Sequence, residues 1–129
     1  MNESGLNNVF TFYGYQDKVG PFLSAADILV LTSDTEGLPG VVPEAGYFST
    51  PSVAANVGGI NECIVNGKSG YVIKKDDVAA FVNKINYLIS NESFLSEMGR
   101  SAKELAINKF NLDNIAESYL TFFNFLLSN

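Results

Sequence analysis

The feature that most constrains the fold is a continuous aliphatic run at residues 28–31, Ile-Leu-Val-Leu, followed by a polar loop rich in glycine. Runs without polar alternation are typical of strands that are buried on both faces, as in a parallel sheet. Parallel strands need crossover connections, which are usually helices. Short apolar runs alternate with helix-like segments up to about residue 74, so the sequence predicts an α/β fold.

Four short strands and three short helices are expected in this first part of the chain. The strands are predicted at residues 9–12, 28–31, 52–55 and 71–73, and the helices at 18–26, 41–48 and 60–65. Beyond residue 75 the apolar periodicity is helical only, which predicts a C-terminal segment of three helices.

Each of these three helices has polar start signals and an apolar stripe. The candidate start residues are Asp76 or Asp77, Asn91 or Ser93, and Asn111 or Asp113. The last stripe consists of Ile115, Tyr119, Phe122, Phe123 and Leu126. The simplest interpretation of all three stripes is packing in the core.

Composition excludes several classes of function. A chain of 129 residues suits one domain, residues 1–129, and its net charge of −6 argues against a nucleic-acid partner. There is no apolar run of the roughly 20 residues that a membrane span needs, and the first residues do not resemble a secretory signal. We therefore expect a cytoplasmic protein. One cysteine and no histidine exclude a disulfide framework, the histidine-based triads and most zinc sites.

The segment from residue 33 to residue 62 carries the chemistry. Glu36 is expected in a loop just past a strand, and Glu44 in the first turn of the next helix, where open α/β sheets bind ligands. A carboxylate can accept two hydrogen bonds from a vicinal diol, while a glycine-rich loop and a helix start favour a phosphate. A nucleotide sugar has both groups. From spacing alone, however, the favoured interpretation is that Glu36 is a solvated loop residue and that Glu44 balances the helix dipole.

The same segment resembles the donor-binding signature of glycosyltransferase family 4, the group 1 glycosyl transferases of GT-B architecture. The family pattern contains E-G-x-P, then E-A after four residues, then a proline, then G-G-x-x-E. The corresponding residues are Glu36-Gly37-Leu38-Pro39, Glu44-Ala45, Pro51 and Gly58-Gly59-Ile60-Asn61-Glu62. The flanks also fit, so the resemblance covers essentially the whole chain. Ser49 and Asn61 depart locally from the usual glycine and proline.

The resemblance implies a partial Rossmann-like parallel sheet and an enzyme, a hexosyltransferase-like glycosyltransferase of polysaccharide biosynthesis. Such enzymes transfer sugar from a nucleotide-activated donor to a glycan or other acceptor with retention of configuration, and need no cofactor or bound metal. Glu36 is implied as the catalytic residue at the donor sugar, and Glu44 as the residue that binds the ribose. The implied donor-binding residues are Glu36, Gly37, Leu38, Pro39, Gly40, Val41, Glu44, Gly58 and Gly59.

The family also has parts that this sequence does not show. These are an N-terminal acceptor domain and two strands upstream of residue 9 that carry a basic pair for the diphosphate. We interpret the chain as the C-terminal portion of a longer enzyme or a truncated gene product, and expect it to be inactive alone. The acceptor domain or a partner subunit would complete it, and any membrane association would come through that absent part. Without the two strands, the sheet must close its gap, swap strands with another copy, or leave the first segment loosely attached.

Other functions stay open at this point. The chain could instead be a non-catalytic nucleotide-sugar-binding module or a split subunit completed by another chain. A GT-B-like epimerase is disfavoured because such enzymes rely on histidines and on a different carboxylate spacing.

Overall fold

A three-stranded parallel sheet lies at the centre of the computed structural model, which describes residue 6 and residues 9–128. The strands are β1 (Leu29–Leu31), β2 (Ser52–Ala55) and β3 (Gly70–Ile73), in the order β1-β2-β3. Val30 pairs with Val53, and Val53 with Tyr71. The sheet is parallel, as the aliphatic runs predicted, and the α/β class is confirmed.

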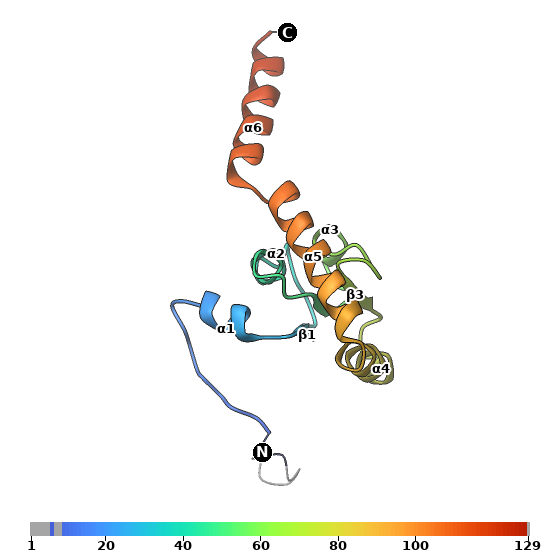
Figure 1. Cartoon of the computed structure of the whole chain (residues 1–129). Helices are drawn as coiled ribbons and strands as arrows, with labels where there is room; N and C mark the ends of the chain where they lie inside the picture. The colour runs from blue at the N-terminus through green and yellow to red at the C-terminus, as the bar shows by residue number, and fades with distance from the viewer. Residues whose placement is uncertain (1–5, 7–8, 129) are drawn as a thin grey trace.

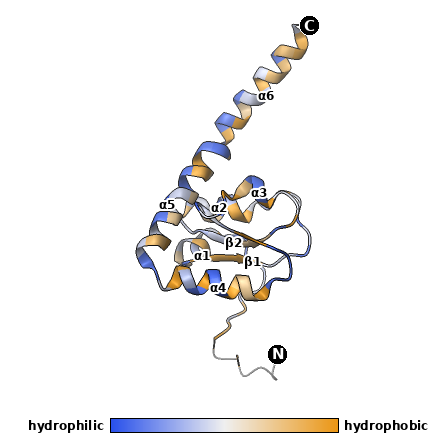
Figure 2. Ribbon diagram, turned by 90° about the vertical axis from the view of Figure 1, so that its right-hand side faces the viewer, coloured by the Kyte–Doolittle hydropathy of each residue, from blue (hydrophilic) through white to orange (hydrophobic). Residues whose placement is uncertain are grey.

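Six helices surround or extend this sheet in the described residues. They are α1 (Gly20–Ala25), α2 (Val41–Tyr47), α3 (Ile60–Cys63), α4 (Val78–Ile89), α5 (Glu92–Lys109) and α6 (Leu112–Leu127). Figure 2 shows the sheet between α2 and α3 on one side and α4 on the other.

Each face of the sheet has its own apolar core. Val53 and its neighbours pack against buried side chains of α4 and α5, namely Phe81, Leu88 and Met98. Ala54 points to the opposite face and packs against Val42, Ile60, Cys63 and Ile64. Because strand residues alternate between faces, burial on both sides explains why β2 is apolar or small throughout.

Two of the helix starts are capped by predicted residues. The Asp77 carboxylate accepts a hydrogen bond from the Ala80 amide at 2.9 Å, and the Asn111 side chain accepts one from the Asp113 amide at 2.8 Å. Asn91 does not cap α5. Its side-chain amide donates to the Tyr87 carbonyl at 2.7 Å and so stabilises the end of α4 instead.

The prediction of a strand at residues 9–12 is wrong. These residues have no regular structure and are exposed, with Val9 72% and Phe12 71% accessible. A strand exists only where a neighbour completes its hydrogen bonds, and β1, at the edge of the sheet, pairs only with β2 within the described residues. The sheet therefore has three strands rather than four.

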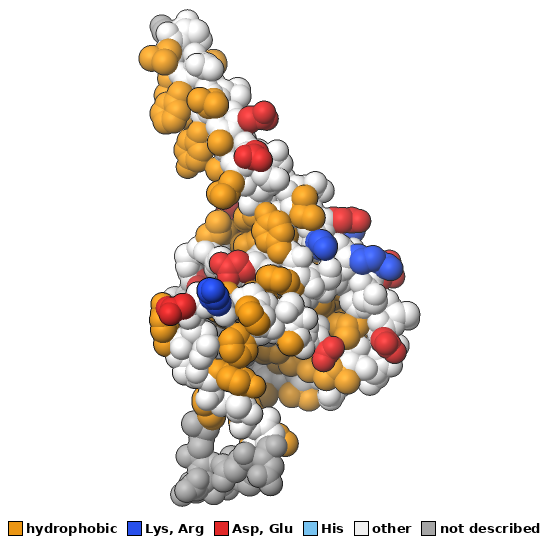
Figure 3. Space-filling model, turned by 60° about the vertical axis from the view of Figure 1, so that its left-hand side comes forward, with side chains coloured by type: hydrophobic (Ala, Val, Ile, Leu, Met, Phe, Trp, Pro, Cys, Tyr) orange, Lys and Arg blue, Asp and Glu red, His pale blue; other side chains and the backbone are white. Residues whose placement is uncertain are grey.

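The prediction of core packing is also wrong for α6. None of its residues is buried, and Tyr119 and Phe122 are 62% and 55% exposed. The helix projects away from the body (Figure 1), and apolar side chains run along it (Figure 3). Periodicity shows which residues share a face of a helix but not what covers that face. In the part of the chain that the structure describes, no helix is both long and apolar enough to cross a bilayer.

Cys63 is buried, with 4% of its surface accessible, and we expect it to react slowly. Burial raises the pKa of its thiol above the ordinary value, Lys109 opposes this shift and Glu62 adds to it. Because the thiolate is the reactive form, native Cys63 should be alkylated by iodoacetamide much more slowly at pH 8 than in the guanidinium-unfolded protein. Mass spectrometry of timed samples measures both rates. Equal rates would contradict this expectation.

Candidate functional site

The candidate site lies where two neighbouring strands end. The loop of residues 32–40 follows β1, and the loop of residues 56–59 follows β2. In parallel sheets with crossover helices, ligands bind outside the carboxyl ends of the strands. Glu36 is partly buried in the first loop, and Glu44 is exposed in the first turn of α2. Both therefore lie in the segments that the sequence predicted.

The two loops contact each other directly. The Gly59 amide donates a hydrogen bond to the Gly37 carbonyl at 2.7 Å. The Leu38 side chain also lies close to Gly59, because a Cβ atom built on Gly59 would be 3.1 Å from Leu38 Cδ1. The structure thus brings together the E-G-x-P and G-G segments, which are about twenty residues apart in the sequence.

Glu44 lies beside the end of the first loop. Its amide donates to the Gly40 carbonyl at 3.1 Å. Its carboxylate oxygen Oε1 would be 3.7 Å from a Cβ atom on Gly40, so the side chain folds back toward this glycine. Buried Pro39 anchors the same turn, where its carbonyl accepts a hydrogen bond from the Val42 amide at 3.2 Å. That Glu36 and Glu44 contact one ligand stays a prediction.

The first loop offers unpaired backbone donors. Within the described part of the chain, the amides of Gly37, Leu38, Gly40 and Val41 have no hydrogen-bond partner. The start of α2 adds less than a helix start usually does, because Pro43 has no N–H and the Val42 amide is already used. An anion at this site would therefore be bound mainly by the loop.

Lys75 was missed in the sequence analysis. It follows β3 and pairs with Asp34 of the first loop, with 3.0 Å between Nζ and Oδ1. The hydrogen bond to Asp34 raises the pKa of Lys75, so this side chain carries its charge at neutral pH. One feature of the sequence could have indicated this pair. The carboxyl ends of parallel strands meet at one edge of the sheet, so the residues that follow β1 and β3 lie near each other. No local spacing indicates this pair.

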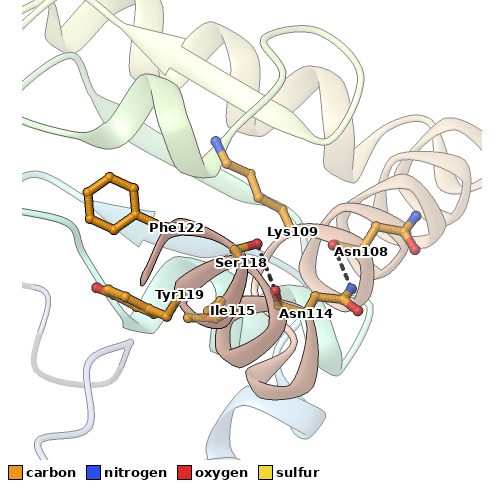
Figure 4. A pocket seen from close by; sticks show the side chains of 7 residues that line it. All are labelled: Asn108, Lys109, Asn114, Ile115, Ser118, Tyr119 and Phe122. Carbon is orange, nitrogen blue, oxygen red and sulfur yellow. Dashed lines mark hydrogen bonds between the residues drawn. The ribbon is translucent and has the colours of Figure 1, made fainter. Parts of the chain in front are cut away.

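A separate cavity of about 460 Å³ lies at the junction of α5 and α6 (Figure 4). Two of its polar side chains form hydrogen bonds within the chain: Asn114 donates to the Asn108 carbonyl at 3.2 Å, and Ser118 donates to the Asn114 carbonyl at 2.8 Å. Lys109, also in its lining, donates to the Glu62 carbonyl at 2.8 Å. The remaining lining consists of Asn108 of α5 and three side chains of α6, Ile115, Tyr119 and Phe122, and we assign no chemistry to this cavity.

The comparisons with known proteins agree with the fold and the motif. The family "Glycosyl transferases group 1" matches residues 1–105, so the chain belongs to this family. The chain is 30% identical over 112 residues to N-acetyl-alpha-D-glucosaminyl L-malate synthase of Bacillus anthracis, covering 87% of this chain and 29% of that protein. It is 36% identical over 107 residues to trehalose synthase of Pyrococcus furiosus, covering 83% and 26%.

Solved structures show the same arrangement of the chain. HepE from Anabaena in complex with UDP superposes with a TM-score of 0.88 at 25% identity, over 93% of this chain and 33% of HepE. A glycosyltransferase from Rickettsia africae gives a TM-score of 0.87 at 23% identity, over 96% and 34%, which supports the fold. The resemblance to the GT-B C-terminal domain is confirmed. The chain spans about a third or less of the length of these relatives.

Proposed function

We propose that this chain is the donor-binding part of a retaining glycosyltransferase. The observation that carries the proposal is the loop after β1, in which the amides of Gly37, Leu38 and Gly40 are unpaired, as is that of Val41 at the start of α2. Of these residues, Gly40 lies next to the Glu44 carboxylate. Donors for a diphosphate thus lie beside an acceptor for hydroxyl groups. The relative HepE has been crystallised with UDP and with UDP-glucose, a nucleotide and a nucleotide sugar.

Each part of the site has a role in this proposal. The Glu44 carboxylate accepts hydrogen bonds from the ribose hydroxyls, and the loop amides hold the diphosphate as negative charge develops on it. Glu36 lies at the reacting end of the donor, beside the sugar. The amides hold the diphosphate, so the proposal requires no metal. Among the described residues, no group of three or more acidic or cysteine side chains forms a metal-binding cluster.

The acceptor and its binding surface would come from elsewhere. Because the chain spans about a third of its relatives, we propose that an acceptor domain, in the same polypeptide or in a partner subunit, completes the enzyme in the cytoplasm. The alternative of a non-catalytic nucleotide-sugar-binding module would share the same loop. It differs only in that no acceptor domain would restore transfer.

Titration calorimetry with UDP and UDP-glucose tests the proposal. We expect saturable binding of one nucleotide per chain, and UDP should bind at least about tenfold more tightly than uridine, because uridine offers no diphosphate to the loop amides. Equal affinities for UDP and uridine would contradict the role of the loop. An absence of binding to UDP and every nucleotide sugar tested would contradict the proposed function itself.

A further inference from the structure

We propose that Gly58 and Gly59 are positioning residues, which hold the Glu36–Gly37 backbone in place rather than binding the donor themselves. This inference rests on the proposed function and refines it. The resemblance implied that the two glycines belong to the donor-binding residues. The structure shows what they touch, and the contacts are with the backbone of the first loop.

Gly58 is required by its conformation and by its neighbour. Its φ is +52°, in the left-handed region that favours glycine. A Cβ atom at this position would overlap the Glu36 carbonyl oxygen and lie 2.6 Å from the Glu36 carbonyl carbon. Backbone atoms cannot rotate away as the end of a flexible side chain can. Any side chain at residue 58 would therefore push the Glu36 peptide out of its present position.

Gly59 makes the complementary contact. Its amide donates to the Gly37 carbonyl at 2.7 Å, so this N–H group is already used by the protein and is not free for a phosphate. A Cβ atom on Gly59 would be 2.8 Å from the same carbonyl oxygen. The Gly59 hydrogen bond needs this close approach, and only a residue without a side chain permits it without a shift of the loop.

The second loop is well suited to hold the first, because it is itself fixed. The Val57 amide donates to the Ala55 carbonyl at 2.9 Å, the Asn61 side chain donates to the Asn56 side chain at 2.8 Å, and Ile60 is fully buried. Between residues 32 and 38, by contrast, the described hydrogen bonds and ion pairs with other segments are the Gly59 hydrogen bond and the exposed Lys75–Asp34 ion pair. Exposed ion pairs contribute little. The glycine contact is therefore the main restraint on the part of the loop that carries Glu36 and two of the unpaired amides.

A loop that is already restrained loses less conformational entropy when the ligand binds, and this increases the affinity. We therefore expect Gly58→Ala, and the milder Gly59→Ala, to weaken UDP binding at least tenfold in calorimetry at a temperature where each variant is folded. In the same variants, hydrogen exchange measured by mass spectrometry should become faster in the peptide that covers residues 57–62, because the amide of residue 59 loses its hydrogen bond to the Gly37 carbonyl. It should stay unchanged in β2 and α5.

Gly70→Ala is the matched control. A Cβ atom on Gly70 would overlap the Ser52 carbonyl oxygen, so the variant introduces a comparable backbone clash. Gly70 begins β3, however, and lies at the end of the sheet opposite the two loops. We expect a lower melting temperature for this variant, but unchanged UDP affinity of the folded protein and unchanged exchange in residues 57–62.

The two readouts separate the inference from the proposed function. If the unmodified protein binds no UDP, the proposed function fails, while the exchange measurement still decides whether the glycines restrain the loop. Unchanged exchange of residues 57–62 in Gly58→Ala and Gly59→Ala would overturn the inference. So would an equal loss of UDP affinity in Gly70→Ala, because the effect would then reflect general destabilisation.

Discussion

Replacing Glu44 with alanine is expected to lower the affinity of the chain for UDP by roughly 10- to 100-fold. A carboxylate that accepts hydrogen bonds from ribose hydroxyls makes charge-assisted bonds worth about 1.5–3 kcal/mol, and each 1.4 kcal/mol is about a tenfold change in the dissociation constant. Glu44 is exposed in the first turn of α2, so its removal leaves no cavity and should change stability little. Calorimetric titration of both proteins measures the difference.

Two further variants make this result specific. Glu117→Ala removes one carboxylate from α6, which projects away from the site, and should leave UDP affinity unchanged. Glu44→Gln keeps an acceptor oxygen but loses the charge, so we expect an intermediate affinity. Wild-type affinity in Glu44→Ala would contradict the ribose role. A loss of similar size in Glu117→Ala would show that net charge rather than a specific contact is responsible.

The strands of the observed sheet could be predicted because their residues are constrained locally. Ser52–Ala55 is buried throughout and is apolar or small, as a central strand requires. Leu29–Leu31 lies at the edge of the sheet and leaves Val30 44% exposed, so its aliphatic run marked a strand but not burial on both faces. The segment at residues 9–12 also suits a strand, because it consists of β-branched and aromatic residues, but it forms none. Composition sets how well a segment suits a strand, whereas pairing depends on a distant neighbour that no local pattern reveals.

The site was predictable only in part, for a similar reason. The glycines and Glu44 could be named from their motif, because backbone approach and hydroxyl recognition each require particular residue types. The hydrogen bond from Gly59 to Gly37 and the ion pair of Lys75 with Asp34 join different loops, and they follow from the order of the strands. Periodicity alone could not show that the stripe of α6 is exposed, since it resembles the periodicity of α4, which buries Phe81 and Leu88.

The largest expected effect concerns activity: we expect the 129-residue chain alone to transfer no sugar. Transfer requires stabilisation of the leaving diphosphate, and preorganised electrostatics usually supplies the largest catalytic contribution. The one described cation in contact with the loop after β1 is Lys75, whose charge is paired with Asp34. The net charge of −6 also disfavours an anionic donor. Transfer requires in addition an acceptor oriented against the sugar, and orientation alone is worth several orders of magnitude in rate.

The assay mixes the purified chain with UDP-glucose, other nucleotide sugars and candidate acceptors, and measures the release of nucleoside diphosphate. A full-length relative, the trehalose synthase of Pyrococcus furiosus, serves as the positive control with its own substrates. The chain should bind donor in calorimetry yet release no diphosphate above the background of a Glu36→Ala, Glu44→Ala double variant. Binding without release would assign the deficit to acceptor positioning and charge stabilisation, in a chain that spans about a quarter of that relative. Turnover comparable with that of the full-length enzyme would show that the residues described here already contain the complete catalytic machinery.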